Sequence, residues 1–325
     1  MALEKLARPI VGLVLAVCAA TEALAQAAYP ARPVRIVVPY SAGGPADIYG
    51  RFIGDRLQKA LGQPFVVENR PGAGAIIGTE AVAKSAPDGY TLLMMSNTHT
   101  VNESLFTRKP YSLLRDLTPI APVNYSDLIL VVHPSVPAKN LKELIELAKT
   151  KPGTLNYASS GPGTPYHMAG ELFKAMAGID VVHVPHKGSA EARTDVLAGN
   201  VQMMFDAITT MAPLAQAGKV RAIATSGKTR SAITPDVPTM SEAGVPGYDA
   251  VIWLGVMAPA GTPKPIVDLL NSDIEKIVNS PEVKAAWAKQ GAVPMRMTPE
   301  EFGKFMEQDI QKWAKVVKFS GARID

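Results

Sequence analysis

Short β-rich runs alternate with segments of helical periodicity, and this alternation constrains the fold more than any other feature of the sequence. In the first third of the chain, strands are predicted at 35–39, 65–67 and 90–95, with helices at 48–61 and in the segment ending at 83. A strand, a helix and a second strand at this spacing form a right-handed βαβ unit on a parallel sheet. The sequence therefore predicts an α/β protein.

The same alternation starts again at residue 128. Further strands are predicted at 128–132, 155–158, 181–184, 201–205, 220–224 and 251–257, and helices at 141–149, 167–177, 190–198 and 211–217. Two amphipathic helices, at 265–279 and 299–318, end the chain with no sheet of their own, so we expect them to return and cover the first sheet.

Two series of this kind in 325 residues indicate two domains, since about 150 residues form a typical domain. We expect lobe 1 to comprise residues 26–125 plus 252–325, and lobe 2 residues 126–251. The chain would then cross between the lobes at least twice.

The N-terminus has the composition of a secretory signal peptide. Lys5 and Arg8 precede an apolar run at 10–20, and Ala23 and Ala25 fit the small-residue rule for cleavage, which we expect after Ala25. The run is too short for an uncleaved anchor, which needs ~20 apolar residues. Cys18 lies within the run, so the mature chain contains no cysteine, which suits export to an oxidising compartment.

The composition argues against a nucleic-acid partner and against metal or cofactor chemistry. The net charge is +4, but the basic residues are scattered. His183 and His186 point to opposite faces of an extended segment, and the other histidines have no partner at ligand spacing. The glycines at 72–78 resemble a dinucleotide fingerprint, but no acidic residue follows at 90–96, so no cofactor is expected.

Two strand-to-helix loops carry the strongest functional signal, one in each lobe. They span residues 39–47 and 159–167, are rich in glycine and hydroxyl side chains, and run directly into a helix start. Glycine lets the backbone approach a ligand closely, and the N–H groups of a helix start attract anions. As an alternative, Asp47 and Thr164 could simply cap their helices.

Hydrolase chemistry has weaker support. The sequence contains no Gly-x-Ser-x-Gly nucleophile elbow. Ser159 or Ser160 paired with His167 is the alternative that would make the protein an exported hydrolase. We therefore expect a binding protein and no catalytic residues.

The motifs together resemble the Bug family, the substrate-binding proteins of tripartite tricarboxylate transporters. The resemblance rests on the export signal and on several motifs in order: residues 39–47, 68–74 (ENRPGAG), 87–90 (PDGY), 160–167 (SGPGTPYH), 184–188 (VPHKG), and 238–239 (PT) followed by Glu242. It covers essentially the whole mature chain.

The resemblance implies a type II-like periplasmic-binding-protein architecture with mostly parallel sheets and a ligand cleft between the two lobes. In that family, main-chain amides, hydroxyls and ordered waters hold a small carboxylate. Carried over residue by residue, the first-lobe contacts would be Tyr40, Ser41, Ala42, Gly43, Gly44, Asp47, Ser96, Asn97 and Thr98. The second-lobe contacts would be Ser159, Ser160, Gly163, Thr164, His167, Lys187, Gly188, Ser189, Phe205 and Asp206.

The resemblance also implies a ligand and a partner. The ligand would be a di- or tricarboxylate or an aromatic acid, the latter favoured by Tyr40, Tyr166 and Phe205. The partner would be the membrane permease subunits of a tripartite transporter, served by a monomeric receptor that opens and closes. The sequence leaves two alternatives open, a periplasmic hydrolase that acts on a carboxylate and a sensor for a signalling partner.

Overall fold

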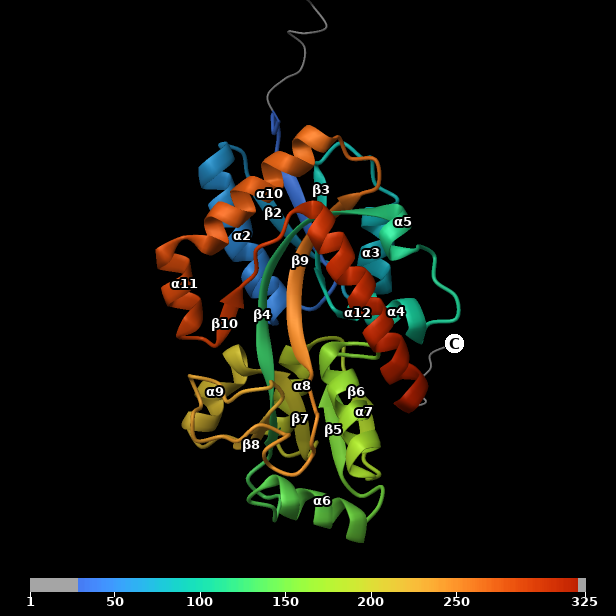
Figure 1. Cartoon of the computed structure of the whole chain (residues 1–325), viewed down its shortest axis with the longest axis vertical. Helices are drawn as coiled ribbons and strands as arrows, with labels where there is room; N and C mark the ends of the chain where they lie inside the picture. Colours follow the sequence, from blue (N-terminus) through green and yellow to red (C-terminus); the bar gives the residue numbers. More distant parts are fainter. Residues whose placement is uncertain (1–28, 321–325) are drawn as a thin grey trace, which may run out of the picture.

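The computed structural model describes residues 29–320, which form two α/β lobes joined by two long strands (Figure 1). The predicted signal peptide, with Cys18 and the cleavage position after Ala25, lies outside the described residues. Within residues 29–320, no helix is long and apolar enough to cross a membrane.

The first lobe begins with three strands that alternate with helices, as predicted. Its elements are β1 (Val34–Val38), α2 (Pro45–Leu61), β2 (Phe65–Asn69), the 3₁₀ turn η1 (Ala73–Ala75), α3 (Ile76–Ala83), β3 (Thr91–Ser96), α4 (Thr98–Leu105) and α5 (Leu113–Asp116). Helix α2 shows why the local sequence folds in this way. Pro45 suits its first turn, Tyr49, Ile53 and Leu57 form its buried face, and Gly62 ends it with a left-handed backbone.

The long strand β4 (Leu117–Val132) leads into the second lobe. That lobe contains α6 (Leu141–Thr150), β5 (Asn156–Ser159), α7 (Pro165–Ala177), β6 (Val182–Pro185), α8 (Ser189–Leu197), β7 (Met203–Ala207), α9 (Ile208–Gln216) and β8 (Arg221–Thr225). Strand β9 (Val251–Pro259) returns to the first lobe, followed by α10 (Lys264–Asn279), α11 (Pro281–Ala288), β10 (Ala292–Pro294) and α12 (Pro299–Ser320).

Each lobe contains one parallel triple of strands. In the first lobe β1 lies between β2 and β3, and in the second β5 lies between β6 and β7. The parallel pairing predicted from the βαβ spacing holds within these triples, whereas β4 and β9 pair antiparallel with each other and with β7 and β3. The loops after the central strands β1 and β5 leave at switch points of the strand order, where α/β sheets open a crevice for ligands.

Strand β4 is longer than the sequence analysis predicted, because its first half contains Pro119 and Pro122. Proline cannot donate a ladder hydrogen bond and normally argues against an inner strand. Here the register with β9 shifts next to each proline, so bulges accommodate both residues inside a continuous strand.

Strand β4 changes partners where it passes between the lobes. Asp127 is paired with Val251 of β9, and Leu128 with Ala207 of β7. We propose that the lobe boundaries lie next to this change of partners, with the described residues 29–125 and 252–320 on one side and 126–251 on the other.

The C-terminal helices cover more than the first sheet. Helix α10 packs against β4 and α2, as expected, but α12 packs on α4 and on α7 of the second lobe. Trp313 and Val317 of α12 join the buried apolar cluster of the second lobe. Both helices cover the first sheet as expected, since Phe302 and Met306 of α12 belong to the same buried cluster as Leu93 of β3. Helix α12 also reaches the second lobe, because a 22-residue helix is about 33 Å long and extends beyond the first lobe.

A stack of aromatic rings fills the second lobe beneath the loop after β5. The rings of His167 and His183 stack at 4.2 Å, and Tyr157 stacks on His183 at 4.9 Å. Burial lowers the pKa of His167 to about 4 and the pKa of His183 to about 3, so both rings are neutral at pH 7. Neutral rings can accept hydrogen bonds from the loop above them.

We predict that replacing Gly255 by alanine destabilises the fold. A Cβ at this position of β9 would lie 2.4 Å from Cζ of Phe302, and overpacking of this kind costs about 1–3 kcal/mol. Thermal unfolding should therefore occur several degrees lower. The control is Gly303→Ala in α12, where the nearest atom would be Pro119 Cγ at 3.6 Å and where alanine favours the helix. Equal melting temperatures for the two variants would contradict the packing.

We also predict a pH dependence from the histidine stack. Both pKa values lie below the ordinary value of 6.5, so on acidification the unfolded chain binds protons before the folded protein does. The free energy of unfolding should fall from about pH 6.5 to about pH 4, by up to about 1.4 kcal/mol per pH unit per histidine. In urea unfolding at pH 7.5 and 5.0, the free energy of unfolding should fall less for His183→Gln than for the unmodified protein. The same fall in both proteins would show that the histidine stack is not the cause.

Candidate functional site

Three helices begin at the interface between the lobes. Helix α2 follows the loop after β1, α7 follows the loop after β5, and α8 follows β6. Their N-caps are Gly44, Thr164 and Gly188. Each first turn presents N–H groups that have no partner within its own helix, together with the positive end of the helix dipole. The interface therefore favours a negatively charged group.

A small cavity of about 20 Å³ lies between these helix starts. It takes its walls from both lobes and from the connecting strand β9. The residues that line it are Tyr40, Ser41, Gly44, Pro45, Ala46, Ser96, Ser160, Pro165, Tyr166, Ser189, Ile252 and Leu254. None of these side chains carries a formal charge at pH 7.

The first-lobe loop is held in shape by Asp47. Its carboxylate accepts hydrogen bonds from the Gly43 N–H at 3.0 Å and from Asn69 at 3.0 Å, and it pairs with Arg51 at 2.9 Å. Burial alone would raise the pKa of Asp47, but these donors outweigh it and lower the pKa. Asp47 is therefore an ionised anchor for the loop and does not line the cavity.

The end of β3 contributes a second set of hydroxyls to the first lobe. The hydroxyls of Tyr40 and Ser96 lie 2.7 Å apart, and Ser96 donates to Thr98 at 3.0 Å. Burial raises the pKa of Tyr40 to about 12, although its hydrogen bonds to Ser96 and Thr98 act in the opposite direction. Tyr40 is a neutral phenol, and its ring forms part of the cavity wall.

The second-lobe loop rests on the histidine stack. The Ser159 hydroxyl lies 2.6 Å from Nε2 of His183, and the Gly163 N–H donates to Nδ1 of His167 at 3.1 Å. Thr164 caps α7 and donates to the Gly161 carbonyl at 2.7 Å. These contacts hold the loop from below and leave Ser160 facing the cavity.

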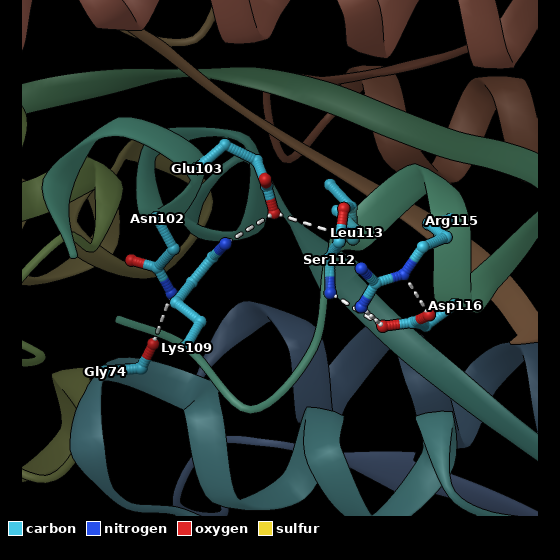
Figure 2. A network of polar contacts seen from close by, with 8 residues as sticks. All are labelled: Gly74, Asn102, Glu103, Lys109, Ser112, Leu113, Arg115 and Asp116. Atoms are coloured by element: carbon cyan, nitrogen blue, oxygen red, sulfur yellow. Dashed lines mark hydrogen bonds and ion pairs between the residues drawn. The ribbon is translucent and has the colours of Figure 1, made fainter. Parts of the chain in front are cut away.

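Glycines of the second lobe face polar side chains of the first lobe closely enough to leave no room for a Cβ. A Cβ at Gly188 would lie 2.7 Å from Cβ of Ser41 across the interface, and one at Gly163 would lie 2.5 Å from Oδ1 of Asn102. Figure 2 shows Asn102 donating through its other amide atom to the Gly74 carbonyl, 2.9 Å away. Asn102 therefore fixes a first-lobe loop and faces the second lobe at the same time.

The structure brings six of the predicted site residues together around the cavity: Tyr40, Ser41, Gly44, Ser96, Ser160 and Ser189. Other predicted residues lie in the same loops or helix starts but do not line it: Ala42, Gly43, Asp47, Asn97, Thr98, Ser159, Gly163, Thr164, His167 and Gly188.

Phe205 and Asp206 were predicted to line the cleft, and the structure places both in the core. Phe205 packs between Phe173 and Tyr248, and Asp206 is fully buried and pairs with Arg193 at 2.9 Å. Every residue of β7 is buried, so its strand pattern could not show which side chains reach a cleft. An aromatic pocket wall therefore rests on Tyr40 and Tyr166 alone.

Lys187 lies in a second hollow between the lobes, on the other side of Ser160. Its walls include residues 72–75 of the first lobe and Gly161, Pro162 and His186 of the second. Only Ser160 lines both spaces.

The sequence analysis missed the contribution of β9. Ile252 and Leu254 line the cavity from the strand that joins the lobes, and they are two residues apart, so they share one face. The apolar period of that strand was the available signal, but it does not distinguish a core face from a cavity wall. Pro45, Ala46 and Pro165 were also missed, although they start the helices that follow the two predicted loops.

Comparisons with known proteins agree with this architecture. The family model of the tripartite tricarboxylate transporter family receptor, TctC, matches residues 50–321. The chain is 39% identical to BugT of Bordetella pertussis over 317 residues, which covers 97% of each protein.

Two similar solved structures contain ligands. Rpa4515 of R. palustris, solved with adipate, has a TM-score of 0.88 at 35% identity, covering 90% of this chain and 98% of that one. MatC of Rhodopseudomonas palustris, with bound malate, has a TM-score of 0.85 at 33% identity, covering 89% and 100%. The match of fold, family model and full-length relatives confirms the resemblance found in the sequence: the chain belongs to the tripartite tricarboxylate transporter receptor family, the Bug proteins, which are periplasmic solute-binding receptors.

Proposed function

We propose that this protein captures a small carboxylate in the cavity between its lobes and delivers it, chemically unchanged, to the membrane subunits of a tripartite tricarboxylate transporter. The observation that carries the proposal is the convergence of three helix starts on one cavity without a charged side chain. Adipate in Rpa4515 and malate in MatC support a carboxylate ligand.

A neutral cage of donors suits a receptor that must release its ligand. First-turn N–H groups and the hydroxyls of Ser41 and Ser160 would satisfy the carboxylate oxygens from both lobes. A buried carboxylate without such donors would cost several kcal/mol, so the ligand favours the arrangement in which both lobes contribute. Binding would therefore shift an open–closed equilibrium toward the closed form.

Export by the N-terminal segment, with cleavage after Ala25, would place the mature receptor in the periplasm, where we propose that it acts as a monomer. The permease subunits would recognise the closed form. A sensor role would use the same ligand chemistry with a different partner.

The structure gives little support to hydrolysis. Ser159 is fully buried and pairs with His183, not with His167 as the alternative required, and it does not line the cavity. Ser160 lines the cavity, but no hydrogen bond joins it to a histidine among the described residues. The depressed pKa of His183, caused first by burial, would also make it a poor general base.

We predict that Ser160→Ala weakens carboxylate binding about 10- to 100-fold, because a hydrogen bond to a charged group contributes about 1.5–3 kcal/mol. The ligand is the acid that gives the largest thermal shift to residues 26–325 in a panel of mono-, di- and tricarboxylates. Ser135→Ala, which is on the surface of the second lobe, is the matched control. An unchanged dissociation constant for Ser160→Ala would remove this residue from the site, and hydrolysis of an ester of the acid that is lost in Ser160→Ala would favour the hydrolase.

We also predict that Gly188→Ala opposes closure without unfolding the protein. The residue has φ −170°, which alanine adopts freely, but its Cβ would meet Ser41 across the interface. Ligand affinity should fall about tenfold or more, in line with a packing cost above 1 kcal/mol, and the ligand-dependent decrease in radius of gyration in small-angle scattering should shrink. Gly303→Ala, away from the cavity, should bind as the unmodified protein does. Normal affinity and normal compaction in Gly188→Ala would contradict the close approach of Gly188 to Ser41 in the ligand-bound protein.

A further inference from the structure

The polar groups of the cavity are unevenly distributed over its walls. The hydroxyls come from the loops and helix starts, as Ser41, Ser96, Ser160 and Ser189. The other walls are apolar: Pro45, Ala46, Pro165, Ile252, Leu254 and the rings of Tyr40 and Tyr166. Among the residues that line the cavity there is no lysine, arginine, histidine, asparagine or glutamine.

Two of the hydroxyls that line the cavity are already engaged, because Tyr40 and Ser96 bond to each other at 2.7 Å. This leaves Ser41 of the first lobe and Ser160 and Ser189 of the second as the serine donors that face the ligand. Proline at the first helical position of α2 and α7 also removes one N–H from each helix start. The remaining donors suffice for one carboxylate group.

Basic side chains of the neighbouring segments do not reach this cavity. Arg193 of α8 pairs with buried Asp206 at 2.9 Å, and Lys187 lines the second hollow on the other side of Ser160. A second carboxylate on the ligand would therefore lie against Ile252 and Leu254. An ionised group buried without partners is strongly disfavoured.

We infer that the cavity selects a small acid with a single carboxylate and a compact apolar body, aliphatic or aromatic. The inference rests on the proposed function and narrows its ligand class. It separates this chain from Rpa4515 and MatC, whose solved structures contain the dicarboxylates adipate and malate. The loops and helix starts would hold the carboxylate, and β9 would contact the apolar end.

The test compares acids matched in skeleton. Dissociation constants for residues 26–325 are measured by calorimetry at pH 7.5 with butyrate against succinate, hexanoate against adipate, and benzoate against terephthalate. We expect the best monocarboxylate to bind at least tenfold more tightly than its dicarboxylate partner. A dicarboxylate that binds equally or more tightly would overturn this inference and leave the receptor function standing. Failure of every mono-, di- and tricarboxylate to bind the folded, ligand-free protein would overturn both.

Two substitutions of Ile252 test whether the apolar wall formed by β9 causes the preference for one carboxylate. Valine and threonine have nearly the same shape, but only Ile252→Thr adds a hydroxyl to that wall. We expect Ile252→Val to keep the preference for one carboxylate and Ile252→Thr to reduce it severalfold. If each variant changed the two affinities by the same factor, the apolar β9 wall would not be the source of the selectivity.

Discussion

Strand β4 is hydrogen-bonded into both lobes, and the geometry of the site depends on that sharing. Its first half pairs with β9 and β10, and its second half with β7 and β8. Because the two sheets share one strand, the parallel triples are connected to each other through β4. The loops after their central strands then face each other, and β9, beside β4, forms the floor between them.

The chemistry of the site follows from what these loops contain. Each loop ends in a helix start, so the attraction for an anion comes from backbone groups, whose orientation is set by the helices themselves. The residues that hold the two loops in place differ in their charge. Asp47 keeps its charge through three donors, whereas burial keeps His167 and His183 neutral, so that they can accept hydrogen bonds. The charges therefore lie behind the cavity, not in its walls.

The sequence analysis identified the features of the fold that depend only on neighbouring residues, such as loops and helix starts. The loops near Ser41 and Ser160 were found because glycine, serine and proline before a helix have a direct backbone meaning. Phe205 and Leu254 could not be assigned in the same way, since strands buried on both faces lack a period that separates core from cavity. The first half of β4 was missed because Pro119 normally excludes an inner strand, and only the pairing with β9 shows the bulge that accommodates it.

Helix α12 adds a third connection between the lobes, beside β4 and β9. Asp309 accepts hydrogen bonds from Thr100 of α4 at 2.6 Å and from Trp253 of β9 at 3.2 Å, while Trp313 packs one turn further along in the second-lobe core. A lobe rotation that only bends the two strands would break the contacts that α12 makes with the two lobes. Because packed side chains interdigitate and resist gradual deformation, these contacts have to change from one packed arrangement to another. Opening would then combine hinge bending at the strands with shear along α12, and the receptor would exchange between two discrete states.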